Sequence, residues 1–116
     1  MTISSVASLP ARQPQLDGSA SQLEWAERIR IQVNAEFDRV AASFQSVAGR
    51  QDAAKRAHTQ FIISILEDKR AEVMSNHRAG YFIRDWQEIS DQVRQMIFLD
   101  PRYQSIKKLP KERAAL

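Results

Sequence analysis

The sequence predicts an all-α protein: an antiparallel bundle of three helices with a long first helix, a flexible N-terminal leader and a basic C-terminal tail. Apolar residues recur at steps of three and four in three separate segments, which is the spacing of one helix face. The 116 residues include only 3 Gly and 4 Pro, and no segment alternates polar and apolar residues as a strand does. Short connections between the three segments favour an antiparallel bundle.

The composition is that of one globular domain. The chain is 43% hydrophobic and 27% charged, and both values are near the globular average. We divide it into a leader over residues 1–18, a helical domain over 19–101 and a tail over 102–116. The leader is rich in Ser, Ala, Pro and Gln without helical spacing, which is typical of a disordered or loosely docked segment.

The first helix is predicted over residues 19–48. Ser19 and Gln22 have the spacing of a capping box, and Gly49 is suited to end the helix. The apolar stripe between them comprises Ala26, Ile29, Val33, Phe37, Val40, Phe44 and Val47. Because this helix is longer than its partners, we expect one end to project or to be covered by another chain. The stripe is also compatible with self-association.

The second helix is predicted to begin after Asp52, a plausible N-cap, and to end between residues 75 and 80. Asn76 and Gly80 are the stop signals. Its apolar face comprises Ala54, Ala57, Phe61, Ile62, Ile65, Leu66 and Val73. Residues 67–70, with the sequence EDKR, are expected to form a solvated face.

A third helix is predicted to end at Asp100, because the residue before a proline disfavours helical geometry. One of its faces comprises Ile83, Trp86, Ile89, Val93, Met96 and Ile97. The three helices should then bury a shared core, for which we expect Trp25, Ile29, Phe37, Phe61, Ile65, Trp86 and Val93.

Charge is unevenly distributed along the chain. The net charge is +3, whereas the tail has five basic residues against Glu112, a net charge of +4. The remainder therefore carries −1. Because residues 1–101, the body of the protein, are nearly neutral, their net charge gives little reason to expect that they bind nucleic acid.

No catalytic, cofactor or metal motif is visible. The chain has no cysteine, which excludes thiol chemistry and fits a cytoplasmic location. It has neither a nucleophile elbow nor a phosphate-binding glycine loop, and His58 and His77 lack the spacing of a metal site. Neither a membrane-spanning segment nor a signal peptide is found. We expect no enzyme, no cofactor, no metal ion, no small-molecule substrate and no membrane partner.

Residues 16–30, LDGSASQLEWAERIR, resemble a recurring L-x-G-S-x-x-Q-x-x-W-A-x-x-I-R pattern. That pattern occurs in small bacterial and phage-associated proteins of unknown function. Such proteins often have a later segment similar to F-W-I-D-N-R, from which residues 81–86, YFIRDW, depart. The resemblance implies a small bacterial helical protein and implies no activity.

Two classes of function remain. The first is a non-enzymatic helical protein-interaction module that acts by helix-in-groove contact or by self-association. The second is a nucleic-acid-binding accessory protein that uses the basic tail without sequence specificity. The candidate contacts are Arg50, Lys55, Arg56, Arg78, Arg84, Lys107, Lys108, Lys111 and Arg113.

Among these candidates, Arg78 and Arg84 belong to the segment that is densest in aromatic and basic residues, 76–86. Aromatic rings beside arginines can stack bases and hold phosphates. Core packing is the stronger interpretation, because Phe82 or Ile83 and Trp86 have the spacing of a buried helix face.

Overall fold

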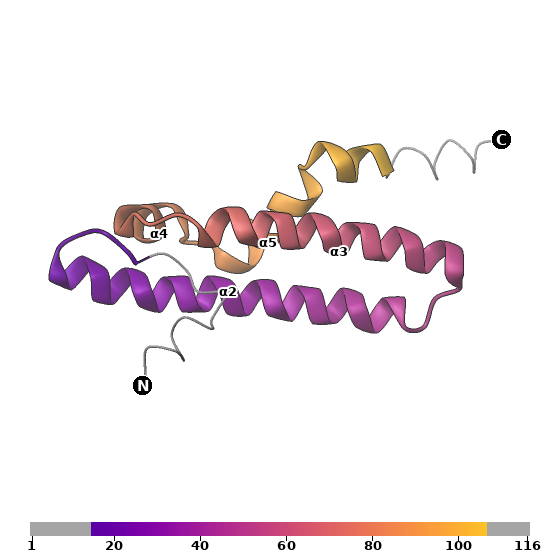
Figure 1. Ribbon diagram of the computed structural model, residues 1–116, viewed down its shortest axis with the longest axis horizontal. Helices are drawn as coiled ribbons and strands as arrows, with labels where there is room; N and C mark the ends of the chain where they lie inside the picture. Colours follow the sequence, from indigo (N-terminus) through magenta and orange to yellow (C-terminus); the bar gives the residue numbers. More distant parts are fainter. Residues whose placement is uncertain (1–14, 107–116) are drawn as a thin grey trace, which may run out of the picture.

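The computed structural model describes residues 15–106, and every regular element within them is helical (Figure 1). The all-α prediction is therefore confirmed. The elements in chain order are α2 (Ala20–Ala48), α3 (Ala53–Met74), α4 (Ala79–Asp85) and α5 (Ile89–Phe98). Residues 101–106 form a further helical segment.

The two long helices, α2 and α3, lie side by side as an antiparallel hairpin (Figure 1). Helix α4 packs against α2, whereas α5 packs against both long helices. In Figure 1, α4 lies at the end opposite the α2–α3 turn, and neither α4 nor α5 reaches that turn. The hairpin thus has an inner half packed against other helices and an outer half near the turn.

The ends of the hairpin helices follow from local side-chain chemistry. The Ser19 hydroxyl accepts from the Gln22 backbone N–H at 3.3 Å, and the Gln22 side chain accepts from the Ser19 N–H at 3.0 Å. The predicted capping box is therefore confirmed. Asp52 accepts from the Lys55 N–H at 3.0 Å and begins α3, as expected. Helix α3 ends at Met74, immediately before the predicted window.

The prediction of one continuous third helix is wrong. Between α4 and α5, Trp86 has φ −115° and ψ 63°, outside the helical region. Its side chain turns inward and packs edge-on against Phe37, with ring centroids 6.4 Å apart. Gln92 stabilises the break, because it accepts from the Glu88 N–H at 2.8 Å and donates to the Asp85 carbonyl.

The third segment also ends differently from the prediction. Helix α5 ends at Phe98, and Pro101 begins the helical segment 101–106 rather than closing the domain. Proline is favoured at a first helical position, where its missing N–H leaves no bond unmade. Tyr103 packs against the core, so the beginning of the predicted tail belongs to the folded body.

The last residues of the predicted leader, 15–18, dock on the folded body, whereas residues 1–14 lie outside the described part of the chain. Leu16 is buried. Asp17 forms a parallel bridge with the segment before α4. Its backbone N–H donates to the His77 carbonyl at 2.6 Å, and its carbonyl accepts from the Ala79 N–H at 3.0 Å. A Cβ at Gly18 would lie 2.9 Å from the Ala79 Cβ, so this close approach favours glycine.

The core lies between the inner half of the hairpin and the two shorter helices. Its largest fully buried side chains include Phe37, Phe82 and Val93. Of the predicted core residues, Phe37, Ile65, Trp86 and Val93 are buried and Ile29 is partly buried. Trp25 and Phe61 are 56% and 42% exposed, so both predictions are wrong.

Candidate functional site

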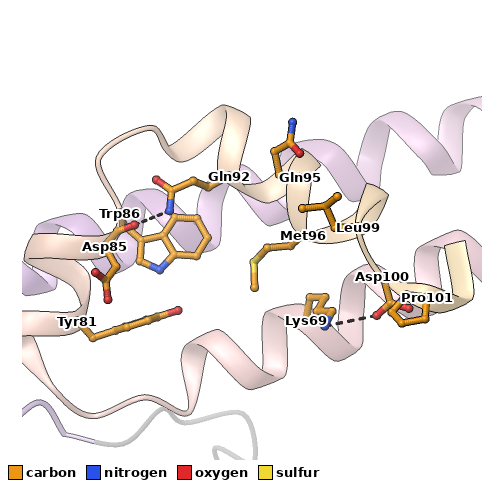
Figure 2. Close-up of a pocket in the computed structure, with 10 residues that line it drawn as sticks. All are labelled: Lys69, Tyr81, Asp85, Trp86, Gln92, Gln95, Met96, Leu99, Asp100 and Pro101. Carbon is orange, nitrogen blue, oxygen red and sulfur yellow. Dashed lines mark hydrogen bonds and ion pairs between the residues drawn. The ribbon is translucent and has the colours of Figure 1, made fainter. Parts of the chain in front are cut away.

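An open pocket of about 390 Å³ lies between α3, α4, α5 and the residues that follow α5 (Figure 2). Figure 2 shows Tyr81 and Trp86 on one side and Lys69 with Asp100 on the opposite side. Its volume is near the lower limit of small-ligand sites. The lining residues are Lys69, Tyr81, Asp85, Trp86, Gln92, Gln95, Met96, Leu99, Asp100 and Pro101.

The apolar part of this pocket combines a fixed wall with an exposed rim. Trp86 is 4% exposed, so most of its ring belongs to the core. Leu99 is 70% exposed, the largest value among the large apolar side chains of the described chain. Met96 lies between them in the lining and is half-buried (Figure 2). An apolar group that enters from outside would therefore contact chiefly Leu99 and Met96, with the small exposed part of Trp86 behind them.

A charged network fixes the opposite side of the pocket. The buried Asp100 carboxylate accepts from the Arg102 backbone N–H at 2.8 Å and from its guanidinium at 3.0 Å, and it lies 3.4 Å from Lys69 Nζ. The hydrogen bond from Arg102 holds the pKa of Asp100 well below its usual range. Arg102 also contacts Asp68 at 2.7 Å. The network attaches the segment after α5 to α3.

Tyr81 is the titratable aromatic group of the pocket. It is half-buried, and burial raises the pKa of its hydroxyl above the usual value, whereas a hydrogen bond with the Trp86 side chain opposes this rise. The nearby charges of Asp85 and Glu72 raise the pKa further. Tyr81 is therefore a neutral hydroxyl near pH 7. The side of the pocket near Tyr81 has acidic surroundings.

A second, smaller groove of about 130 Å³ lies between α2 and α5. It is lined by Arg39, Val40, Ser43, Phe44, Arg94, Ile97 and Phe98. Both arginines already have acidic partners, since Arg39 pairs with Glu36 and Arg94 Nη1 lies 3.9 Å from Asp91. The hydrogen bond from Arg39 lowers the pKa of Glu36. This groove therefore offers less unpaired charge than the larger pocket.

The predicted contact residues share one property in the structure. Residues 15–106 contain twelve Lys and Arg residues, and seven of them form ion pairs with carboxylates. The five for which the described chain shows no such pair are Arg50, Lys55, Arg56, Arg78 and Arg84. These five are the predicted candidates within the described range. The tail candidates Lys107, Lys108, Lys111 and Arg113 lie outside it.

Three of these five residues surround the α2–α3 turn. Arg50 and Lys55 are exposed, and Arg50 contacts the Ser46 hydroxyl at 3.2 Å. Arg56 reaches across the turn and donates to the carbonyls of Ala48 at 3.1 Å and Gln51 at 2.9 Å. The structure therefore brings these three predicted candidates together on one small surface.

The other two candidates do not form a base-stacking surface. Phe82 is fully buried, and Trp86 is nearly so. The ring of Tyr81 packs edge-on against Phe82, with centroids 4.9 Å apart. Arg78 precedes α4, and Arg84 bends back over Gly80. The aromatic rings of the segment therefore belong to the core or line the pocket, which confirms the core interpretation.

The histidines do not meet in a metal site. His58 is exposed on α3, and His77 Nδ1 lies 3.0 Å from the Asp17 carboxylate. Within residues 15–106, no group of three or more His, Asp or Glu side chains could hold a metal ion. In the same range, no helix is both long enough and apolar enough to cross a membrane.

The large pocket was not predicted from the sequence. Residues 67–70 were expected to be a solvated face, yet Lys69 lines the pocket and pairs with Asp100. The sequence feature that could have indicated this pocket is the triplet Leu99–Asp100–Pro101. In this triplet an apolar residue lies outside the predicted apolar helix face and close to a proline.

Comparison with known proteins identifies no relative. No family model matches the chain, and neither a curated protein nor a solved structure is significantly similar to it. The resemblance of residues 16–30 to a bacterial and phage-associated pattern therefore stays a prediction, and function has to be argued from the surfaces described above.

Proposed function

We propose that the protein is a non-enzymatic helical interaction module that holds an apolar side chain of a partner helix in the large pocket. The observation that supports this proposal is Leu99, a 70% exposed apolar side chain at the rim of a pocket with an aromatic wall. Exposed apolar groups around a concave aromatic surface are typical of binding sites. The Asp100 network holds the pocket in place, so little ordering is required on binding.

The charges around the pocket favour a partner side chain that is apolar and has a basic group beside it. Asp85 forms no ion pair within residues 15–106, and Glu72 has only a long contact of 3.7 Å with Lys69. Lys69 itself is compensated by Asp100 at 3.4 Å. A cation entering near Tyr81 would therefore meet uncompensated carboxylates, whereas an anion would be repelled.

The test is a titration of the ¹⁵N-labelled protein with two small probes that share a phenyl ring. L-phenylalaninamide is cationic, and N-acetyl-L-phenylalanine is anionic. We expect the cationic probe to shift the backbone amide signals of Tyr81, Met96 and Leu99, with a dissociation constant on the order of millimolar for so small a group. The anionic probe should shift them several-fold less at the same concentration.

Leu99→Ala should weaken binding of the cationic probe several-fold. Ile31→Ala is the matched control, because Ile31 is also exposed, at 65%, but does not line the pocket. Circular dichroism should show that both variants remain helical. Equal shifts with the two probes, or equal binding by both variants, would contradict the proposed site.

A further inference from the structure

The α2–α3 turn, residues 49–56, differs from the rest of the α2–α3 hairpin in its charge pairing. Each basic residue of α2 itself pairs with a carboxylate on the same helix. At the turn, Arg50, Lys55 and Arg56 form no ion pair within residues 15–106. The single acidic residue there, Asp52, caps α3 by accepting from the Lys55 N–H. The turn therefore has uncompensated positive charge, although the folded body as a whole is balanced.

The position of the turn makes this charge accessible. The turn lies at one end of the molecule, where neither α4 nor α5 covers the hairpin (Figure 1). Gly49, Ala53 and Ala54 are small and exposed, so a flat or convex partner can approach the backbone closely. The guanidinium of Arg56 is held by the Ala48 and Gln51 carbonyls, which fixes one charge in place.

The chemistry of the turn favours phosphate over a protein surface. Protein interfaces depend on large aromatic or aliphatic anchors at their centre, and residues 49–56, GRQDAAKR, contain none. Phosphate contacts need only Lys, Arg and polar groups on an accessible surface. We infer that the α2–α3 turn binds the phosphate backbone of a nucleic acid without reading its sequence. This inference concerns a surface distinct from the pocket and goes beyond the proposed function.

The experiment measures binding of the full chain to a fluorescein-labelled DNA duplex by anisotropy, at several salt concentrations between 50 and 200 mM. The test variant is Arg50→Gln/Lys55→Gln, which leaves Arg56 in place across the turn. The matched control is Arg28→Gln/Arg39→Gln, which removes the same charge from residues that are paired with Glu24 and Glu36. The tail is present in all three proteins, so its contribution cancels.

Each phosphate contact contributes about −0.9 to the slope of log affinity against log salt on duplex DNA. We therefore expect the slope of the test variant to be shallower by about 1.8, corresponding to two lost contacts, and that of the control to change by much less. The same slope in the test variant and the wild type would overturn the inference. So would an equal loss in both variants, because bulk charge would then explain it.

A competition distinguishes nucleic acid from an acidic protein. Unlabelled duplex and poly-L-glutamate are compared at matched charge concentration as competitors of the labelled duplex. We expect the duplex to compete at several-fold lower concentration, because the turn contacts phosphates closely. Equal competition by both polymers would overturn the nucleic-acid assignment in favour of an acidic protein partner.

Discussion

Asp100 connects α5, α3 and the segment 101–106 through a single buried carboxylate. It accepts hydrogen bonds from Arg102 and lies 3.4 Å from Lys69 Nζ. This role was not predictable from the sequence, because Lys69 is 31 positions away and only folding brings it close to Asp100. The caps at Ser19 and Asp52 were predictable, because each depends on partners three positions away.

Asp100→Asn should lower the free energy of unfolding at pH 7 by about 2 kcal/mol, since hydrogen bonds to charged groups contribute roughly 1.5–3 kcal/mol. The folded-state pKa of Asp100 is lowered, first by the Arg102 side chain. This stabilisation is therefore present above the unfolded pKa of about 3.9 and is lost as pH falls through the lower folded-state pKa. Urea denaturation at pH 7 and pH 3 should show a smaller difference from wild type at pH 3.

The control for this experiment is Asp91→Asn. Asp91 is exposed and lies 3.9 Å from Arg94, so its loss should change stability by less than about 1 kcal/mol. If the effect of Asp100→Asn were the same at both pH values, the stabilisation would not come from its ionised carboxylate.

At the scale of elements, periodicity predicted the two long helices but not the break between α4 and α5. The steps from Ile83 through Trp86 to Ile89 fit one helix face. The break depends on inward packing of Trp86 against Phe37 and on the Gln92 side chain, which bonds backbone groups on both sides. Neither Gly nor Pro marks this position, so the sequence contains no local signal for it.

Phe37 and Phe61 provide a matched test of the hairpin helices. Phe37 is fully buried on α2, whereas Phe61 on α3 is 42% exposed. Truncation to Ala should cost about 3–5 kcal/mol at Phe37 and less than about 1 kcal/mol at Phe61. The free energy of unfolding from denaturant titration measures both. A loss at Phe61 as large as that at Phe37 would mean that another chain covers Phe61 in solution.

At the scale of the whole molecule, the uneven covering of the hairpin separates two surfaces. The inner half packs against α4 and α5 and presents the pocket, whereas the outer half ends in the basic turn (Figure 1). The predicted length of the first helix indicated that one of its ends would project or be covered by another chain. It could not place the short helices along the hairpin, since this depends on contacts such as Asp17 with His77, 60 positions apart.

Because α4 and α5 cover only the inner half of the hairpin, we expect local stability to differ along α2 and α3. Backbone amides open by local fluctuation where few apolar contacts hold a helix, and by global unfolding where many do. We expect amides of residues 44–48 and 53–58 to exchange with solvent at least about tenfold faster than those of 33–37 and 66–73, which corresponds to about 1.4 kcal/mol of local stability. Hydrogen exchange followed by mass spectrometry measures all four ranges in one experiment.

The measurement is repeated at two protein concentrations, because any species that covers the outer half of the hairpin would slow its exchange by mass action. Slow exchange at 44–48 and 53–58 that disappears on dilution would show that a second copy covers this half. Slow exchange that is independent of concentration would contradict the prediction, since the two-helix hairpin would then be as stable as the packed half. Fast exchange at both concentrations is the expected result, because Val47 and Phe61 are 38% and 42% exposed and pack too little to hold the outer turns closed.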